Sequence, residues 1–138
     1  MRIVVSACLL GENCKYNGGN NRNERVLRYV EGYEVIPVCP EMLGGLSCPR
    51  KPVEWVGERV LTRDGDDCTE AFRLGVQRAM DIIADKHIEL AILQSRSPTC
   101  GVNQIYDGTF TGTRIQGSGV LAQALKDAGY RCIDAEDL

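Results

Sequence analysis

The chain alternates apolar runs, rich in β-branched residues, with polar loops and with segments whose apolar residues recur at helical spacing. A continuous apolar run is typical of a strand that is buried on both faces of a sheet. Strands are therefore expected at residues 2–10, 33–38, 88–93 and 130–134. Helices are expected after Asn21 or Asn23 as far as Gly32, over residues 69–86, and between Gly119 and Gly129.

Three further segments complete the predicted fold. Residues 42–52 show no periodic pattern and predict an ordered loop, residues 55–61 predict a strand of a small hairpin, and residues 105–115 predict a hairpin turn. Strands that alternate with helices form a mostly parallel sheet covered on both faces. A chain of 138 residues has the length of about one domain. The sequence thus predicts an α/β protein: a single Rossmann-like three-layer domain over residues 1–138, with a mostly parallel sheet and a small β-hairpin addition.

The charge and hydropathy patterns argue against two classes of partner. The net charge is −3 and no block of like charge occurs. General nucleic-acid binders need clustered cations to displace phosphate counterions, so no nucleic-acid partner is expected. No run approaches the roughly 18 apolar residues of a membrane span, and the run before Cys8 is shorter than a signal-peptide core. We therefore expect a cytoplasmic protein without a membrane partner.

Seven cysteines are many for this length, and the odd number cannot pair completely within one chain. In a reducing compartment, metal binding or catalysis is the better expectation than disulfide formation. Cys8, Cys39 and Cys100 lie at, or shortly beyond, the carboxyl ends of three predicted strands. Because ligands of parallel sheets bind beyond those ends, these thiols are expected to meet at one edge. Cys68 and Cys132 are expected to be inert.

Three thiolates suit an iron–sulfur cluster. A four-iron cluster bound by three cysteines leaves one iron open for exogenous chemistry, much as catalytic zinc sites keep a vacant position. Cys14 and Cys48 are each either a fourth ligand or a bystander. Two other functions use the same cysteines: a metal-free thiol enzyme with Cys100 as nucleophile, and a non-catalytic metal- or sulfur-binding protein. The only histidine, His87, precedes the strand 88–93 and is expected at the surface.

Polar side chains near the cysteines are candidates for proton transfer and substrate binding. Glu41 is the best-placed carboxylate for general acid–base catalysis, although an N-cap or a salt bridge to Arg50 or Arg96 explains it equally well. Ser95 and Ser97 can bond a substrate or their own backbone. In an extended segment these serines share a face, and Arg96 then points the other way, toward a carboxylate that pins the loop.

Four motifs occur in order along nearly the whole chain. They are Ser6-Ala7-Cys8-Leu9-Leu10-Gly11, Lys15-Tyr16-Asn17-Gly18-Gly19, Cys39-Pro40-Glu41 with Gly44-Gly45-Leu46 and Pro49-Arg50, and Ser95-Arg96-Ser97-Pro98-Thr99-Cys100-Gly101. Together they resemble the thiouracil desulfidase family, which was long catalogued only as a domain of unknown function. Two positions depart from the family pattern: Asn17 stands where Asp is usual, and Thr99 stands where Ser is common.

The resemblance implies an enzyme, a desulfidase whose 4Fe–4S cluster is held by Cys8, Cys39 and Cys100 with one iron open. Its substrate would be a small-molecule thiolated base similar to 2-thiouracil. Water would replace the sulfur of C=S, giving C=O and free sulfide without net redox change. A carboxylate would move protons, and a serine would position the ring. The implied site residues are Glu41, Ser97 and Ser95 for catalysis and Ser97, Asn17 and Arg50 for substrate binding.

Overall fold

The computed structural model describes residues 2–138 and contains a four-stranded parallel sheet. Its strands are β1 (Arg2–Ser6), β2 (Glu34–Val38), β5 (Ile88–Leu93) and β8 (Cys132–Asp134), in the spatial order β2-β1-β5-β8. Each neighbouring pair of strands is parallel. Pro37, which has no N–H to donate, lies on the edge strand β2. The predicted α/β architecture with a mostly parallel sheet is confirmed.

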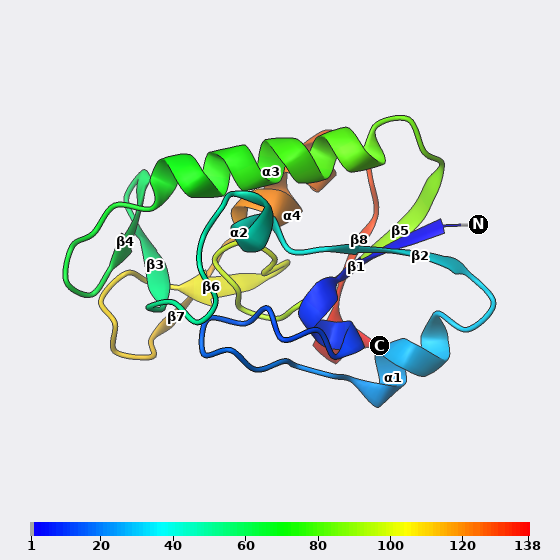
Figure 1. The fold of residues 1–138 in the computed structure, drawn as a ribbon, viewed down its shortest axis with the longest axis horizontal. Coiled ribbons are helices and arrows are strands. Elements are labelled where there is room, and N and C mark those ends of the chain that lie inside the picture. Colours follow the sequence, from blue (N-terminus) through cyan, green and yellow to red (C-terminus); the bar gives the residue numbers. More distant parts are fainter. Residues whose placement is uncertain (1) are drawn as a thin grey trace.

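Helices cover both faces of this sheet (Figure 1). The helices α3 (Thr69–Ile83) and α4 (Val120–Asp127) pack on one face, and α1 (Glu24–Tyr29) packs on the other. The Asn23 side chain accepts hydrogen bonds from the backbone N–H groups of Arg25 and Val26, so it is the N-cap of α1. These layers give the predicted three-layer arrangement.

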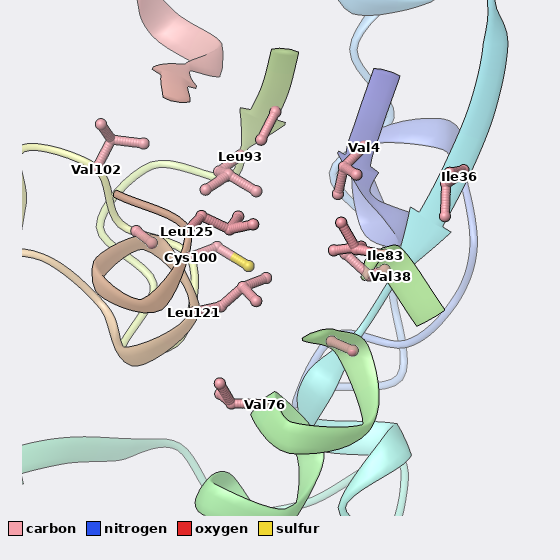
Figure 2. Close-up of a cluster of buried hydrophobic side chains, with 13 residues drawn as sticks. Val4, Ile36, Val38, Val76, Ile83, Leu93, Cys100, Val102, Leu121 and Leu125 are labelled. Atoms are coloured by element: carbon pink, nitrogen blue, oxygen red, sulfur yellow. The ribbon is translucent and has the colours of Figure 1, made fainter. Parts of the chain in front are cut away.

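Two apolar cores fill the space between the layers. On one face Val4 and Leu93 of the sheet belong to a cluster with Leu121 of α4 (Figure 2). On the other face Val5 belongs to a cluster with Val26 of α1. Neighbouring residues of a strand point to opposite faces, so β1 and β5 supply side chains to both cores. This double burial explains why these two strands read as continuous apolar runs.

Two antiparallel hairpins lie beyond the carboxyl ends of the sheet, at the end of the molecule away from the N-terminus (Figure 1). In one, β3 (Val53–Val56) pairs with β4 (Arg59–Thr62); in the other, β6 (Gln104–Tyr106) pairs with β7 (Arg114–Gln116). The indole N–H of Trp55 donates to the Pro98 carbonyl over 2.8 Å and ties the first hairpin to the loop after β5. Within residues 2–138, no helix is long and apolar enough to cross a membrane.

Three local predictions are wrong in their bounds. The first strand ends at Ser6, because residues Ala7–Leu10 form a short 3-10 helix that Gly11 closes with φ +97°. Residues Pro40–Leu43 form the helix α2, so the irregular loop begins later than expected. The segment expected as a single strand over 55–61 spans both strands of the first hairpin.

Candidate functional site

A cavity of about 510 Å³ lies at the carboxyl ends of β1, β2 and β5. Cys8, Cys39 and Cys100 line it, and a fourth cysteine, Cys14, lines it as well. The first three thiols follow three neighbouring parallel strands, which is why residues far apart in the sequence meet at one edge. Cys14 comes from the loop after β1. All seven cysteines are free thiols.

Cys100 belongs both to this cavity and to the apolar core. Figure 2 shows its sulfur beside Leu121 and Leu125, and the residue is buried. Burial raises the pKa of the Cys100 thiol well above its usual range, and a hydrogen bond from the Ser6 hydroxyl opposes that rise. The thiol is therefore protonated near neutral pH unless a metal holds it as thiolate.

The other cavity thiols differ in acidity. Cys14 and Cys39 hydrogen-bond to each other through their side chains. This bond lowers the pKa of Cys39 to about 7, while the same bond and burial raise the pKa of Cys14. Burial also raises the pKa of Cys8, partly offset by a hydrogen bond from Asn21. Cys39 is thus the most acidic thiol of the cavity.

Glu41 reaches the cavity from the first turn of α2, which begins directly after Cys39. This helix packs on α3 so closely that neither helix has room for a side chain at the contact. A Cβ atom on Gly75 would lie 1.8 Å from the carbonyl oxygen of Pro40. One on Gly44 would lie 2.0 Å from a carbonyl oxygen of α3. The backbone contact therefore fixes where α2 places its carboxylate.

Hydrogen bonds hold both carboxylate oxygens of Glu41. Oε1 lies 3.0 Å from Nε and 3.0 Å from Nη2 of Arg50, and Oε2 accepts from the Thr99 hydroxyl at 2.9 Å. The side chains of Glu41 and Arg50 are 17% and 9% exposed, so the ion pair is largely shielded from solvent. A carboxylate has about four acceptor positions, so Glu41 keeps capacity toward the cavity. Glu41 thus forms the salt bridge with Arg50 and also lines the cavity, two roles that the sequence alone left as alternatives.

The protein itself engages most donors of Arg50. Besides Glu41, its guanidinium donates from Nη2 to the Cys14 carbonyl at 2.9 Å and from Nη1 to the Ser47 carbonyl at 3.1 Å. Its backbone N–H donates to the Tyr16 carbonyl at 2.6 Å. Arg50 thus connects Glu41 with the loop that carries Cys14. A role of Arg50 in substrate binding, as predicted, would use a guanidinium that already bonds Glu41 and two backbone carbonyls.

Ser95 and Ser97 both line the cavity, but their hydroxyls differ. Ser95 donates to the buried carboxylate of Asp134 on β8. The oxygen of Ser97 accepts the backbone N–H groups of Thr99 and Cys100, each at 3.1 Å. Among residues 2–138, the structure contains no acceptor bonded to the Ser97 hydrogen. Ser97 is therefore the serine that can donate to a ligand.

The loop after β5 is fastened from two sides. Arg96, whose φ of +59° is unusual for a residue with a side chain, pairs with Glu136. This is the carboxylate partner expected for Arg96, although Arg96 also lines the cavity. On the other side, backbone N–H groups at the start of α4 donate to the carbonyls of Pro98 and Thr99. The loop carbonyls thereby satisfy the otherwise unpaired donors of that helix end.

Two predicted positions lie away from the cavity. Asn17 is not among the described residues that line the cavity. The Asn17 carboxamide oxygen instead accepts the Gly19 N–H at 2.9 Å, which stabilises a turn. Cys48 also lies outside the lining, and its sulfur sits 3.2 Å from the Asn13 carbonyl oxygen and 3.3 Å from that of Lys15. Of the two cysteines left open from the sequence, Cys14 is the one at the site.

The far wall of the cavity comes from the hairpins and was not predicted from the sequence. Tyr106 and Phe110 line it, and Phe110 has φ +59°. Glu54 of β3 holds this wall, because its Oε1 accepts the N–H groups of Gly108 at 2.9 Å and Phe110 at 3.3 Å. Arg63 donates to the Phe110 carbonyl at 2.8 Å. An aromatic wall of this kind suits a planar ring as ligand.

The donor set of the cavity fits a soft metal centre. It offers thiols and no imidazole, since His87 is exposed and outside the lining. Within residues 2–138, no three His, Cys, Asp or Glu side chains are spaced to hold a single metal ion. Thiolates of an iron–sulfur cubane bind different irons and are further apart than the ligands of one ion. The thiols that line the cavity are the type of donor that an iron–sulfur cluster needs.

Together, the fold and the cavity define an α/β protein with thiols from three adjacent parallel strands beside a firmly held carboxylate. The 2-thiouracil desulfurase family matches residues 3–137, and the chain belongs to this family. The resemblance carried by the four sequence motifs is thereby confirmed.

Two relatives share nearly the whole chain. YbbK of Bacillus subtilis (strain 168), an uncharacterized protein, is 38% identical over 146 residues, covering 99% of this chain and 97% of that protein. The solved structure of TudS, a [4Fe-4S]-dependent thiouracil desulfidase, is similar with a TM-score of 0.91 and 36% identity. That match covers 99% of this chain and 92% of the TudS chain.

Proposed function

We propose that this protein is an iron–sulfur-dependent desulfidase that converts C=S of a thiolated nucleobase, such as 2-thiouracil, to C=O and releases sulfide. The observation that carries the proposal is the meeting of Cys8, Cys39 and Cys100 in one cavity beside Glu41. Membership in the 2-thiouracil desulfurase family and the likeness to a [4Fe-4S]-dependent desulfidase support it.

Cys8, Cys39 and Cys100 are the proposed ligands of a 4Fe–4S cluster that has one iron free of protein ligands. The family resemblance assigns these three, and each follows a different one of three neighbouring strands, whereas Cys14 follows the same strand as Cys8. When bound, the cluster supplies a thiophilic iron that polarises the C=S bond and accepts the sulfur that leaves. Every other step falls to side chains of this chain.

Glu41 is the proposed proton carrier. The overall reaction, C=S plus H₂O giving C=O plus H₂S, moves two protons from water to sulfur and transfers no electrons in net balance. A carboxylate at the cavity can take a proton from the attacking water and return it to the departing sulfur. Arg50 and Thr99 hold the two oxygens in one orientation, so the remaining lone pairs of Glu41 keep a fixed direction.

Ser97 is the proposed donor to the substrate ring. Its oxygen already accepts two backbone N–H groups, so its hydroxyl acts toward a ligand only as a donor. The exocyclic carbonyl oxygen of 2-thiouracil is a suitable acceptor, whereas both ring nitrogens next to C=S carry a hydrogen and are donors. Ser95 acts in this proposal through Asp134, by holding the loop, and Asn17 through its turn.

A metal-free thiol enzyme with Cys100 as nucleophile is less well supported. The thiolate is the reactive form, and burial raises the pKa of the Cys100 thiol. The histidine that could act as a base is exposed and does not line the cavity. The cavity thiol with a lowered pKa is Cys39, which the proposal uses as a ligand.

Anaerobic reconstitution of the full chain with iron and sulfide, followed by incubation with 2-thiouracil, tests this function. The expected result is about four irons per chain, absorbance near 400 nm, and release of sulfide in step with formation of uracil. A colourless protein that still releases sulfide would point to the thiol enzyme. An iron-loaded protein that turns over no thiolated base would point to a binding protein.

A further inference from the structure

Asn21 contacts Cys8 at two atoms, and the proposed reaction uses neither contact. Its backbone N–H donates to the Cys8 carbonyl at 2.9 Å. Its side-chain Nδ2 donates to the Cys8 sulfur, 3.6 Å away. Asn21 also lines the cavity, so this carboxamide lies on the ligand side of the loop that leads from Cys8 into α1.

We propose that Asn21 is a positioning residue whose carboxamide N–H donates to the Cys8 thiolate and thereby sets how firmly the cluster is held and how readily it is reduced. This inference rests on the proposed function, because it requires the cluster. Asn21 touches a ligand sulfur rather than the substrate.

A second proposed ligand, Cys100, also has a hydrogen-bond donor beside its sulfur. Ser6, a buried residue at the end of β1, accepts the Gln94 N–H at 3.0 Å. Its hydroxyl also hydrogen-bonds the sulfur of Cys100. This bond lowers the pKa of the Cys100 thiol, as expected when the hydroxyl donates to the sulfur.

The third ligand has a donor as well. The Cys14 thiol hydrogen-bonds the Cys39 sulfur, and a neutral Cys39 thiol in turn donates its hydrogen to the Cys14 carbonyl oxygen, 3.9 Å away. When Cys39 is a thiolate it has no hydrogen to give, so Cys14 must be the donor. Each assigned ligand sulfur thus has a side-chain donor, and backbone N–H groups, that of Met42 at Cys39 and that of Cys8 at its own sulfur, add to two of them.

Physical chemistry gives these contacts a common effect. A hydrogen bond to a ligand sulfur withdraws negative charge from the cluster, and such bonds are one of the factors that set cluster potentials. The added electron of the reduced state makes the bond stronger, so loss of the donor makes reduction harder. Neighbours that bond ligand atoms also raise metal affinity, typically by about 10–100-fold.

The test compares Asn21→Leu with Asn20→Leu in the reconstituted full chain. Leu removes the donor at position 21 but keeps the backbone bond to Cys8. At position 20 it removes a carboxamide of the same loop that bonds Asn13 instead of a cysteine. Two quantities are measured without substrate: the rate of iron transfer to a chelator under anaerobic conditions, and the midpoint potential of the cluster.

For Asn21→Leu we expect iron transfer about tenfold faster and a midpoint potential more negative than that of the wild type. Asn20→Leu should match the wild type in both. Asn21→Asp, which has the same shape but offers no N–H and adds negative charge, should lose iron at least as fast as Asn21→Leu. It also serves if Leu at position 21 prevents folding.

Equal iron transfer and equal potential in the wild type and both Asn21 variants would overturn the inference. A faster iron loss without a shift in potential would also overturn it, because loosening of the loop alone produces that result. If the wild type binds no iron, the proposed function falls and this inference falls with it. If the wild type binds iron and releases sulfide while the Asn21 variants behave like it, the inference alone falls.

Discussion

Thr99 donates its side-chain hydroxyl to Oε2 of Glu41 over 2.9 Å, and this bond joins the loop after β5 to the helix after β2. Thr99 is 1% exposed. Its carbonyl accepts the Leu121 N–H and its own N–H is held by Ser97, so the whole residue is fixed. The carboxylate proposed to move protons is therefore oriented by a neighbouring strand connection as well as by its own helix.

Thr99→Val should lower turnover by about tenfold or more while cluster content stays unchanged. Val has the shape of Thr without the hydroxyl, and a hydrogen bond to a charged group contributes about 1.5–3 kcal/mol. Thr99→Ser restores the donor and should restore most of the rate. Steady-state sulfide release, with iron measured in the same samples, separates the two variants. A wild-type rate in Thr99→Val would show that Arg50 alone is enough to orient Glu41.

Glu41→Gln should reduce sulfide release by about 10²-fold or more with iron still bound, because the amide keeps the shape of the side chain but cannot carry a proton. Glu54 provides a matched control. It is a second cavity carboxylate, and Glu54→Gln keeps a side-chain oxygen for the two N–H groups of the hairpin. We expect Glu54→Gln to lose less than tenfold. If turnover survives in Glu41→Gln but not in Glu54→Gln, Glu54 rather than Glu41 is the residue that transfers protons.

The sequence was enough to predict where the strand-end thiols meet. Each of Cys8, Cys39 and Cys100 follows a continuous apolar run, and such runs are the strongest signal of a buried parallel strand. Because the carboxyl ends of parallel strands lie at the same edge of a sheet, the three cysteines are expected at one edge even when no contact is known. Glu41 followed from its distance to Cys39 by the same reasoning.

The contacts that give each side chain its role could not be predicted. Ser95 bonds Asp134, a residue 39 positions away, and no local pattern encodes that distance. The loop that carries Cys14 has no periodicity, so nothing in the sequence places its thiol against Cys39. The helix α2 is four residues long, too short for an apolar period, and its position depends on a glycine contact with α3.

Ser97→Ala should lower both iron content and turnover, whereas Arg96→Ala should affect iron content less. Removal of the Ser97 oxygen leaves two backbone N–H groups unpaired, one of them on the ligand Cys100. The partner of Arg96 is an exposed carboxylate, and ion pairs of that kind contribute about 0–1 kcal/mol. Iron per chain, measured after identical reconstitution, decides. A larger loss of iron in Arg96→Ala than in Ser97→Ala would show that the ion pair between Arg96 and Glu136 holds Cys100 in place.

In the cluster-free protein, Cys39 should be alkylated half-maximally near its pKa of about 7. The largest cause of this lowered pKa is the hydrogen bond from the Cys14 thiol, ahead of the Met42 N–H and the charge of Arg50, so Cys14→Ala should move the half-maximum to higher pH. Iodoacetamide labelling over a pH series, resolved by peptide mass spectrometry, measures both. Cys68, whose pKa burial raises, serves as an internal reference and should react only at higher pH. An unchanged profile in Cys14→Ala would remove the thiol contact as the cause.

Gly75→Ala should destabilise the protein and reduce cluster content, although alanine favours helices. Helix propensity alone would stabilise α3 by about 0.8–1 kcal/mol. The added Cβ, however, would lie 1.8 Å from the Pro40 carbonyl oxygen, so α2 has to move away. Overpacking of this kind costs about 1–3 kcal/mol, which exceeds the gain.

The neighbouring position supplies the control for this last substitution. Leu74 is on the exposed side of α3, and Leu74→Ala should change the free energy of unfolding by no more than about 0.5 kcal/mol. Thermal unfolding of the cluster-free variants and iron content after reconstitution are the two measurements. Because Cys39 and Glu41 flank Pro40, a displaced α2 should lower iron content in Gly75→Ala beyond what its stability explains. If Gly75→Ala is as stable and as iron-loaded as Leu74→Ala, the contact between the two helices does not set the position of the site.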